Sequence, residues 1–367
     1  MKTKLISFFL LLALLVRALP AADEPIDWNR AQQLHQRAQR GEKLTREEQS
    51  YYDRARTERA KNQPQQTPAD APPQWTEHLT PLTELGAGKY KSEDGGLYGG
   101  GRNEPPKAHL EAALKEAAKI QSLDADGNPS SGGKIVLLSV GMSNTTQEFA
   151  RFKQLADADP AKSPLVVIVD GAQGGQEATR TSAPSAPFWD NIDGRLKRAG
   201  VSPKQVQAIW IKQAIAGPQQ PFPAEAKRLQ SYLVTIVHII KERYPNARLC
   251  YLSSRIYAGY ATTRLNPEPH AYESAFAVRW LIDDQVKGKP ELNYDAARGE
   301  VMAPLLLWGP YLWADGETPR QTDGLVYRRE DLGPDGTHPS ESGRRKVAEL
   351  LLKFLESDPT AKWFTKK

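Results

Sequence analysis

The sequence predicts an α/β fold, a three-layer α/β/α sandwich with a five-stranded parallel sheet of flavodoxin-like strand order. Three observations lead to this prediction. Five short segments are continuously apolar, as strands buried on both faces are. Amphipathic helical segments alternate with them, and polar or glycine-rich segments follow them. The predicted strands are residues 134–140, 165–170, 206–212, 247–253 and 304–309.

The helices are predicted from apolar residues that recur every three or four positions. A first helix lies in "KAHLEAALKEAAKIQ", before the first strand. Five more follow the strands in turn, at residues 145–158, about 188–199, 223–243, 271–286 and 341–356. In a doubly wound sheet, ligands bind beyond the carboxyl ends of the strands, so the chemistry is expected in the segments that follow them.

The N-terminal third has a different character. Residues 1–22 resemble an export signal, with the basic start "MKTK", the apolar core "LISFFLLLALLV" and small residues for cleavage near Ala21 or Ala22. An uncleaved membrane anchor is the alternative. Export would place the protein in the periplasm or outside the cell, with no membrane contact beyond the signal.

Two further segments precede the globular part, residues 76–367. Residues 23–63 are predicted to form a helical hairpin around Gly41, with Thr45 and Glu48 as a capping box. This hairpin suits a packing arm or a docking element. Residues 64–75, rich in Pro, Gln and Ala, are predicted to be a linker.

Composition narrows the classes of function. The net charge is +5 and the pI about 9.0, but the basic residues are scattered, so a nucleic-acid partner is not expected. The single cysteine, Cys250, lies in an apolar run and is expected to be buried and inert. The glycine-rich "SEDGGLYGGGRNEPP" lacks the context of a phosphate loop and is predicted to be an irregular loop.

Two segments beyond the strands carry candidate catalytic residues. The first predicted strand runs into "VGMSNTTQEF", which places Ser143 just before a helix. The segment "DGTHPSESG" places Asp335 and His338 three residues apart before the last helix. A histidine there could activate the serine while the aspartate orients the imidazole. The alternative is that Asp335 only shapes a turn and caps the last helix.

Acyl transfer also needs hydrogen-bond donors for the developing oxyanion. The candidates are the Ser143 N–H at the start of a helix, the Gly174 N–H and the Gln213 side-chain amide. The alternatives are that Gly174 is a simple loop glycine and that Gln213 is a solvent-facing residue at a strand end. The other histidines lack companions at metal-ligand spacing, so no metal site is expected; they are His35, His78, His109, His238 and His270.

These blocks together resemble the SGNH (GDSL-like) hydrolase superfamily over about residues 130–357. "GMSN" departs from the usual Gly-Asp-Ser-Leu block and is similar to the Gly-Gln-Ser-Asn block of sialate- and xylan-acetylesterase-like members. "WIKQA" resembles their Trp-x-Gln block with one extra residue. Because no Asn stands in the third block, Gln213 takes its place as oxyanion donor, or Lys212 faces the site instead.

The resemblance implies an esterase that needs no cofactor and acts through Ser143, His338 and Asp335. Its substrate would be an O-acyl ester, above all an O-acetyl ester on a glycan, or another small ester. Arg255, Trp308 and Tyr311 are the predicted substrate-binding residues. The alternatives are that the aromatic residues belong to the core and that Arg255 forms a surface ion pair.

Other functions remain open at this point. One is acyl transfer to a sugar hydroxyl instead of water, by the same residues. Another, from a different class, is a non-catalytic glycan- or surface-binding protein on the same scaffold. The sequence does not indicate the oligomeric state.

Overall fold

The computed structural model describes residues 25–39, 42–62 and 74–366. The chain divides into two compact units, residues 1–65 and 66–367, and each is described by itself. The predicted export signal, Gly41 and most of the predicted linker lie outside the described residues. Within the described ranges, no helix combines the length and the apolar character that a membrane span requires.

The first unit contains a pair of helices, α1 (Trp28–Gln39) and α2 (Arg46–Asn62). The predicted capping box is confirmed at the start of α2. The N–H of Glu48 donates to Thr45 Oγ1 at 3.2 Å, and the N–H of Thr45 donates to Glu48 Oε2 at 2.9 Å. Arg37 pairs with Glu48 at 2.5 Å and joins the two helices.

The second unit is built on the predicted five-stranded sheet. Its strands are β3 (Ile135–Gly141), β4 (Val166–Asp170), β5 (Val206–Lys212), β6 (Leu249–Ser253) and β7 (Leu305–Trp308). They pair in parallel in the order β4-β3-β5-β6-β7, which confirms the flavodoxin-like order. In the register of the ladder, Gly141 lies beside Lys212, and Lys212 lies beside Ser253.

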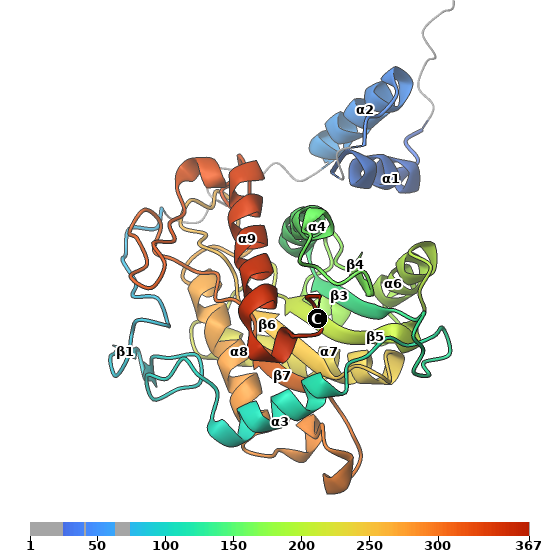
Figure 1. Cartoon of the computed structure of the whole chain (residues 1–367). Helices are drawn as coiled ribbons and strands as arrows, with labels where there is room; N and C mark the ends of the chain where they lie inside the picture. The colour runs from blue at the N-terminus through green and yellow to red at the C-terminus, as the bar shows by residue number, and fades with distance from the viewer. Residues whose placement is uncertain (1–24, 40–41, 63–73, 367) are drawn as a thin grey trace, which may run out of the picture. The chain divides into compact units, whose positions relative to one another are not determined.

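Helices cover both faces of the sheet (Figure 1). On one face lie α4 (Ser143–Ala158) and α9 (Glu341–Ser357), where Phe149 of α4 stacks on Trp210 of β5 at 5.6 Å. The other face carries α6 (Pro187–Arg198), α7 (Ala224–Arg243) and α8 (His270–Val286). This division is what right-handed crossovers produce when the chain reverses direction across a sheet of this order.

Smaller elements complete the second unit. The helix α3 (Lys107–Ala118) precedes the sheet, and α5 (Ala178–Thr181) is a single turn. A two-residue ladder joins β1 (Lys89–Tyr90) to β2 (Glu93–Asp94). The described residues of this unit also form 3₁₀ turns at Pro203–Gln205, Pro290–Leu292, Ala296–Arg298, Arg329–Asp331 and Pro359–Ala361.

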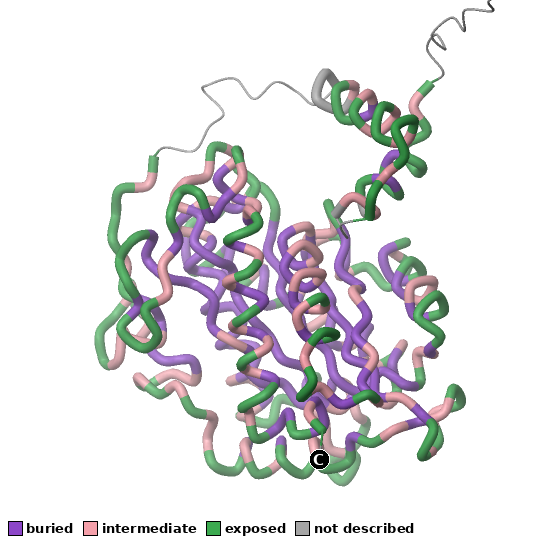
Figure 2. Tube along the Cα trace, turned by 45° about the horizontal axis from the view of Figure 1, so that its top comes forward, coloured by how far each residue is buried: buried purple, intermediate pink, exposed green. Residues whose placement is uncertain are grey.

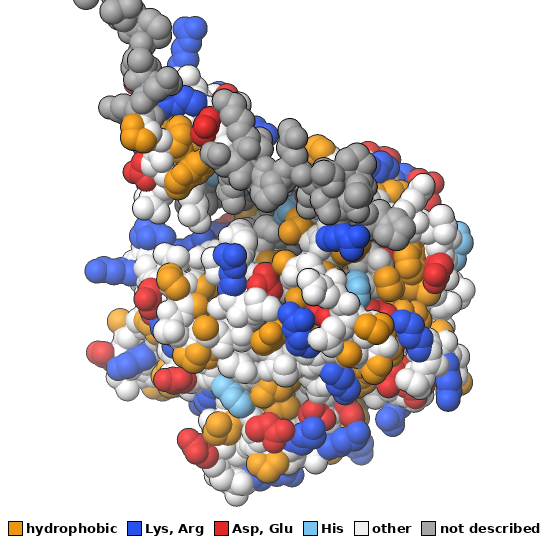
Figure 3. All heavy atoms as spheres, turned by 180° about the vertical axis from the view of Figure 1, so that it is seen from behind, with side chains coloured by type: hydrophobic (Ala, Val, Ile, Leu, Met, Phe, Trp, Pro, Cys, Tyr) orange, Lys and Arg blue, Asp and Glu red, His pale blue; other side chains and the backbone are white. Residues whose placement is uncertain are grey.

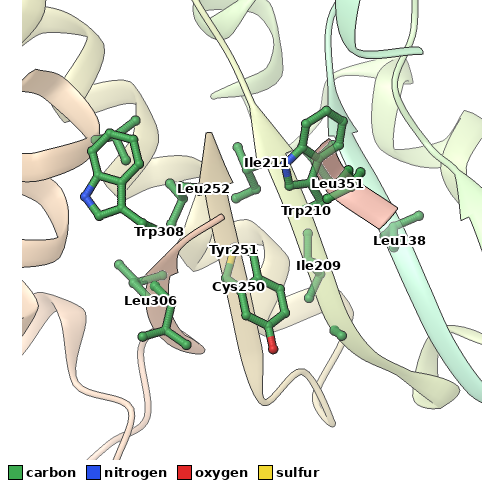
Figure 4. Close-up of a cluster of buried hydrophobic side chains, with 14 of the residues drawn as sticks. Leu138, Ile209, Trp210, Ile211, Cys250, Tyr251, Leu252, Leu306, Trp308 and Leu351 are labelled. Atoms are coloured by element: carbon green, nitrogen blue, oxygen red, sulfur yellow. The ribbon is translucent and has the colours of Figure 1, made fainter. Parts of the chain in front are cut away.

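The core lies along the sheet (Figure 2). The strands β3, β5, β6 and β7 are buried from end to end, whereas the edge strand β4 is half-buried at Val167 and Asp170. Figure 4 shows Leu138, Ile209, Leu252 and Leu306 among its apolar side chains. Cys250 belongs to this core and is fully buried, as predicted. Burial raises the pKa of its thiol, which keeps the sulfur protonated and inert.

The glycine-rich segment forms an irregular loop that touches the end of the sheet. Gly99, Gly100 and Gly101 all have positive φ, a backbone conformation that residues other than glycine adopt only with strain. Nearby, the indole N–H of Trp308 donates to the carbonyl of Leu97 at 2.7 Å. On the face shown in Figure 3, Lys and Arg side chains are interspersed with Asp and Glu side chains.

Candidate active site

Ser143 lies at the start of α4, directly after the turn that leaves β3 through Gly141 and Met142. The helix begins at Ser143 itself, two residues earlier than predicted, so the serine is the first residue of α4 and not part of a preceding loop. The N–H groups in the first turn of a helix have no partner within the helix, which leaves the Ser143 N–H available. Gly141 makes this turn possible, because a Cβ there would overlap with Lys212 O and Thr145 Oγ1.

Three predicted catalytic side chains form one hydrogen-bonded chain. Ser143 Oγ lies 2.7 Å from His338 Nε2, and His338 Nδ1 lies 2.5 Å from Asp335 Oδ2. A carboxylate only accepts hydrogen bonds, so the Nδ1 proton points at Asp335 and Nε2 is left to accept the serine proton. The Asp335 and His338 side chains are 28% and 27% exposed, so substrate and water can approach the pair.

Asp335 is held as a carboxylate. Burial alone would raise its pKa, but the hydrogen bonds from the His338 side chain and N–H, the charge of His338 and the Thr337 N–H together lower the pKa to about 2. The two backbone N–H groups donate to Asp335 Oδ1, each at 3.0 Å. Because Oδ1 is held by the backbone, Oδ2 remains directed at the imidazole.

Sequence reasoning missed the residue that joins the two catalytic segments, Asn144. Its side chain is buried and donates from Nδ2 to the carbonyl of Thr337 at 2.8 Å. This bond ties the first turn of α4 to the residue just before His338. A polar residue next to the nucleophile was the signal, but its partner lies 193 positions away in the sequence.

The loop after β6 also contacts the segment that carries Asp335 and His338. The N–H of Thr262 donates to the carbonyl of Asp335 at 2.9 Å. Gly336 has a φ of +62°, and a Cβ there would overlap with the carbonyl of Tyr260. The close approach of these two loops therefore requires glycine at position 336.

Gly174 lies in the exposed loop after β4. The neighbouring Gln173 N–H donates to the carbonyl of Gly141 at 3.0 Å, which holds this loop beside the nucleophile turn. A Cβ at Gly174 would meet open space. The arrangement suits its predicted role as an oxyanion donor, which stays a prediction.

The structure corrects the prediction for Gln213. Its side chain is buried, and its amide nitrogen donates to Gln176 O at 3.2 Å and to Thr181 Oγ1 at 2.9 Å. Both amide hydrogens are thereby engaged, so Gln213 has no free N–H for an oxyanion. Instead, the residue ties the end of β5 to the loop after β4.

Lys212, the alternative to Gln213, does not face the site either. It is completely buried, and its ammonium pairs with both carboxylate oxygens of Glu148 on α4, at 2.6 Å from Oε1. Burial lowers the pKa of Lys212 to about 8, although the charge of Glu148 opposes this change. A lysine at the end of a buried strand is a sequence signal for a buried acidic partner, and Glu148 is the partner that sequence reasoning missed.

The predicted substrate-binding residues are not presented to a ligand. Trp308 and Tyr311 are 4% and 5% exposed, and the Tyr311 hydroxyl accepts from the N–H of Leu82 at 3.1 Å. They belong to the core because Leu82 and Leu97 are buried with them, and the Trp308 indole donates to the carbonyl of Leu97. Arg255 is 1% exposed, so it is neither a surface ion pair nor an open binding residue.

The described residues hold no group of three or more His, Cys, Asp or Glu side chains suited to a metal ion. The remaining predicted histidines have local partners, such as His109 Nε2 with Leu306 O at 2.8 Å and His78 Nδ1 with Asp315 Oδ2 at 2.8 Å.

No protein-family model and no curated protein sequence matches the chain. Among solved structures it is similar to a Bacteroides fragilis protein that has been proposed to be an acylhydrolase, with 13% identity, a TM-score of 0.36, and coverage of 70% of this chain and 100% of that one. The periplasmic domain of a lipopolysaccharide acetyltransferase from Salmonella ser. Paratyphi A shows 15% identity, a TM-score of 0.34, and coverage of 66% and 93%.

A 3-ketoacyl-(acyl-carrier-protein) reductase from Brucella melitensis reaches a comparable level, with 18% identity, a TM-score of 0.31, and coverage of 64% and 94%. Proteins of unrelated chemistry thus resemble the chain to the same degree.

Proposed function

We propose that this chain is a serine ester hydrolase of the SGNH type in which Ser143 is the nucleophile. The hydrogen-bonded chain from Ser143 Oγ through His338 to Asp335 carries this proposal. The order of these residues, each in a segment beyond a strand or before the last helix, supports it as well. A turn-shaping role for Asp335 alone would not explain why His338 Nε2 meets the serine hydroxyl.

The reaction follows from the geometry. Ser143 Oγ attacks the acyl carbonyl while His338 Nε2 takes the hydroxyl proton, and Asp335 stabilises the imidazolium that forms. The N–H groups of Ser143 and Gly174 hold the oxyanion. The imidazolium returns its proton to the leaving alcohol, which departs. Water then attacks the acyl-serine with His338 again as base, which releases the carboxylic acid and restores the serine.

The substrate is proposed to be an O-acyl ester, above all an O-acetyl ester on a carbohydrate. The protein itself is proposed to be exported. The support for this finer proposal is the similarity of the "GMSN" block to carbohydrate acetylesterase-like members and the signal-like N-terminus. The aromatic residues Trp308 and Tyr311, at and just beyond the end of β7, do not support it, because they are buried in the core.

The test of the chemistry is covalent labelling with a fluorophosphonate probe, followed by mapping of the labelled residue by mass spectrometry. Labelling of the wild type at Ser143 that is lost in Ser143→Ala and His338→Ala is the expected result. Folded wild-type protein that reacts with neither the probe nor a small ester, such as p-nitrophenyl acetate, would contradict the proposal.

The test of the substrate is a panel of esters of increasing acyl length, together with acetylated xylan and acetylated sialic acid. We expect the highest kcat/KM for acetyl esters. A preference for long acyl chains would replace the carbohydrate esterase with a lipase or thioesterase. Product analysis with added sugar alcohols separates hydrolysis from acyl transfer.

A further inference from the structure

The catalytic aspartate and histidine lie in a loop that is closed at its base. Leu332 and Pro339 form an isolated antiparallel bridge, and just inside it the Gly333 N–H donates to the carbonyl of His338 at 2.7 Å. We call residues 332–339 the catalytic loop. The mechanism above requires the imidazole to be aimed at the nucleophile, so whatever fixes the shape of this loop affects the reaction.

The base of the catalytic loop is also joined to the segments on either side of it. The 3₁₀ turn Arg329–Asp331 precedes the loop, and α9 follows it. The Ser340 N–H donates to the carbonyl of Asp331 at 2.9 Å, and Ser340 Oγ donates to the carbonyl of Glu330 at 2.6 Å. The buried Asp331 carboxylate pairs with Lys346 of α9 at 2.5 Å. These contacts fix the two ends of the loop but not the peptide groups between them.

Two carbonyls in the middle of the catalytic loop are held from outside it. The Thr262 N–H, in the loop after β6, donates to the carbonyl of Asp335. The Asn144 side chain, in the first turn of α4, donates to the carbonyl of Thr337. Each contact orients one peptide group relative to a different element. The carbonyls of residues 332–334, which lead into the catalytic aspartate, need other partners.

Arg329 supplies these partners, and the mechanism above does not use it. Its Nη1 donates to the carbonyls of Leu332 at 3.2 Å and Gly333 at 2.9 Å, and its Nη2 donates to the carbonyl of Pro334 at 3.0 Å. The guanidinium is planar and presents its N–H groups in a fixed fork. One side chain therefore orients three successive peptide groups, and the last of them is the peptide bond to Asp335.

The three bonds are not needed to satisfy the carbonyls. Arg329 is exposed, and water could bond the same three oxygens. Among the described residues, no carboxylate pairs with Arg329, so no ion pair keeps its side chain in this place. Ordering a long side chain also costs conformational entropy. What the guanidinium adds beyond water is a fixed geometry, which restrains the backbone that enters the catalytic aspartate.

We propose that Arg329 is a positioning residue, which holds the entry to the catalytic loop so that His338 Nε2 stays within reach of the Ser143 hydroxyl. The inference rests on the proposed function, because it assigns Arg329 a role in that reaction. Arg329 acts through the backbone and not at the reacting atoms. Without it, the carbonyls of residues 332–334 would turn to water, and the imidazole would move relative to the serine. A displacement of about 1 Å can lower a rate about a hundredfold.

The test compares Arg329→Gln with the wild type in three measurements. These are kcat and KM for p-nitrophenyl acetate, the rate of fluorophosphonate labelling at Ser143, and the melting temperature. We expect kcat and the labelling rate to fall by about 10- to 100-fold in the variant. KM and the melting temperature should stay close to those of the wild type, because the loss affects the alignment of the base in the chemical step.

Further variants separate the geometry of the side chain from its charge. Arg329→Lys keeps the charge, but its single nitrogen cannot replace the two nitrogens of the fork, so we expect a loss close to that of Arg329→Gln. In Arg329→Ala, free guanidinium below the concentration that unfolds the protein should restore part of the activity, whereas ammonium at the same concentration should not. The matched control is Arg298→Gln, another exposed arginine of a 3₁₀ turn, in the segment that enters β7, and it should behave as the wild type.

A folded Arg329→Gln protein with the kcat and labelling rate of the wild type would overturn the proposal, and a lower melting temperature in such a protein would leave Arg329 a structural residue. An equal loss in Arg298→Gln, or an Arg329→Lys protein as active as the wild type, would also overturn it. If Arg329→Gln fails to fold, the comparison of Arg329→Lys with the wild type decides. A wild type that is not labelled at Ser143 would instead contradict the proposed function.

Discussion

Asp335 is expected to affect both the catalytic rate and the pH dependence of the protein's stability. Asp335→Asn keeps an oxygen for the N–H groups of Thr337 and His338 but offers an amide where His338 Nδ1–H needs an acceptor. The imidazole would then be held in the wrong tautomer or rotated away. We expect kcat to fall by about 10³–10⁴-fold with an intact fold. Steady-state kinetics and circular dichroism check this, and a loss below tenfold would contradict it.

The same carboxylate should make the stability depend on pH. Its pKa is lowered to about 2 in the folded chain from an ordinary value of 3.8, so the folded state favours the ionised form. Its contribution is complete above the ordinary pKa and is lost as the pH falls towards 2. The melting temperatures of the wild type and Asp335→Asn should therefore converge between about pH 4 and pH 2. A difference that stays constant over this range would contradict the prediction.

At the scale of elements, the turn from β3 into α4 depends on Gly141. An alanine there would place its Cβ against the backbone carbonyl oxygen of Lys212 and against Thr145 Oγ1. These two atoms are hydrogen-bonded to each other, because the Thr145 hydroxyl donates to the Lys212 carbonyl. Such overpacking costs typically about 1–3 kcal/mol, and here it also displaces Ser143. We expect Gly141→Ala to lower both the free energy of unfolding and the labelling rate.

Gly132→Ala is the matched control, because Gly132 lies exposed before β3, outside the catalytic residues, and its Cβ would meet open space. It should leave stability and labelling close to those of the wild type. Equal behaviour of the two alanine variants would show that the turn tolerates a side chain at position 141.

The ion pair between α4 and β5 is the second element-scale feature. Removing one partner leaves the other charge buried alone, which costs about 3–5 kcal/mol, whereas replacing both with apolar residues is often nearly neutral. Lys212→Met and Glu148→Leu should each be strongly destabilising, and the double variant should be more stable than either. Urea unfolding measures this; additive losses in the double variant would contradict the coupling.

At the scale of the whole molecule, the division into two units predicts where a protease can cut. Limited proteolysis of the full chain is expected to cleave within residues 62–75 and to leave a stable fragment that contains the second unit. Because Ser143, His338 and Asp335 all lie in that unit, the fragment should be labelled as fast as the full chain. Cleavage first within the sheet, or slower labelling of the fragment, would contradict this.

Much of the second unit could be predicted because its signals are local. Continuous apolar runs such as "VQAIWIK" mark strands buried on both faces, and their alternation with helices, together with right-handed crossovers, leaves few strand orders. The convergence of the carboxyl ends then brings Ser143 towards Asp335 and His338. Helix ends were less certain, as the start of α4 shows, because the first turn has no intrahelical bonds of its own.

The sequence by itself determined the fold class, the strand order and the catalytic candidates. The reason is that the spacing of apolar residues and the alternation of strands with helices are visible in short segments of the sequence. Only the tertiary structure decided that Trp308, Tyr311 and Arg255 are buried, that the Gln213 amide is engaged, and that Glu148 meets Lys212. These facts depend on which distant segment covers each side chain. A polar residue on a helix or an aromatic residue after a strand has the same local pattern whether solvent or another loop lies against it.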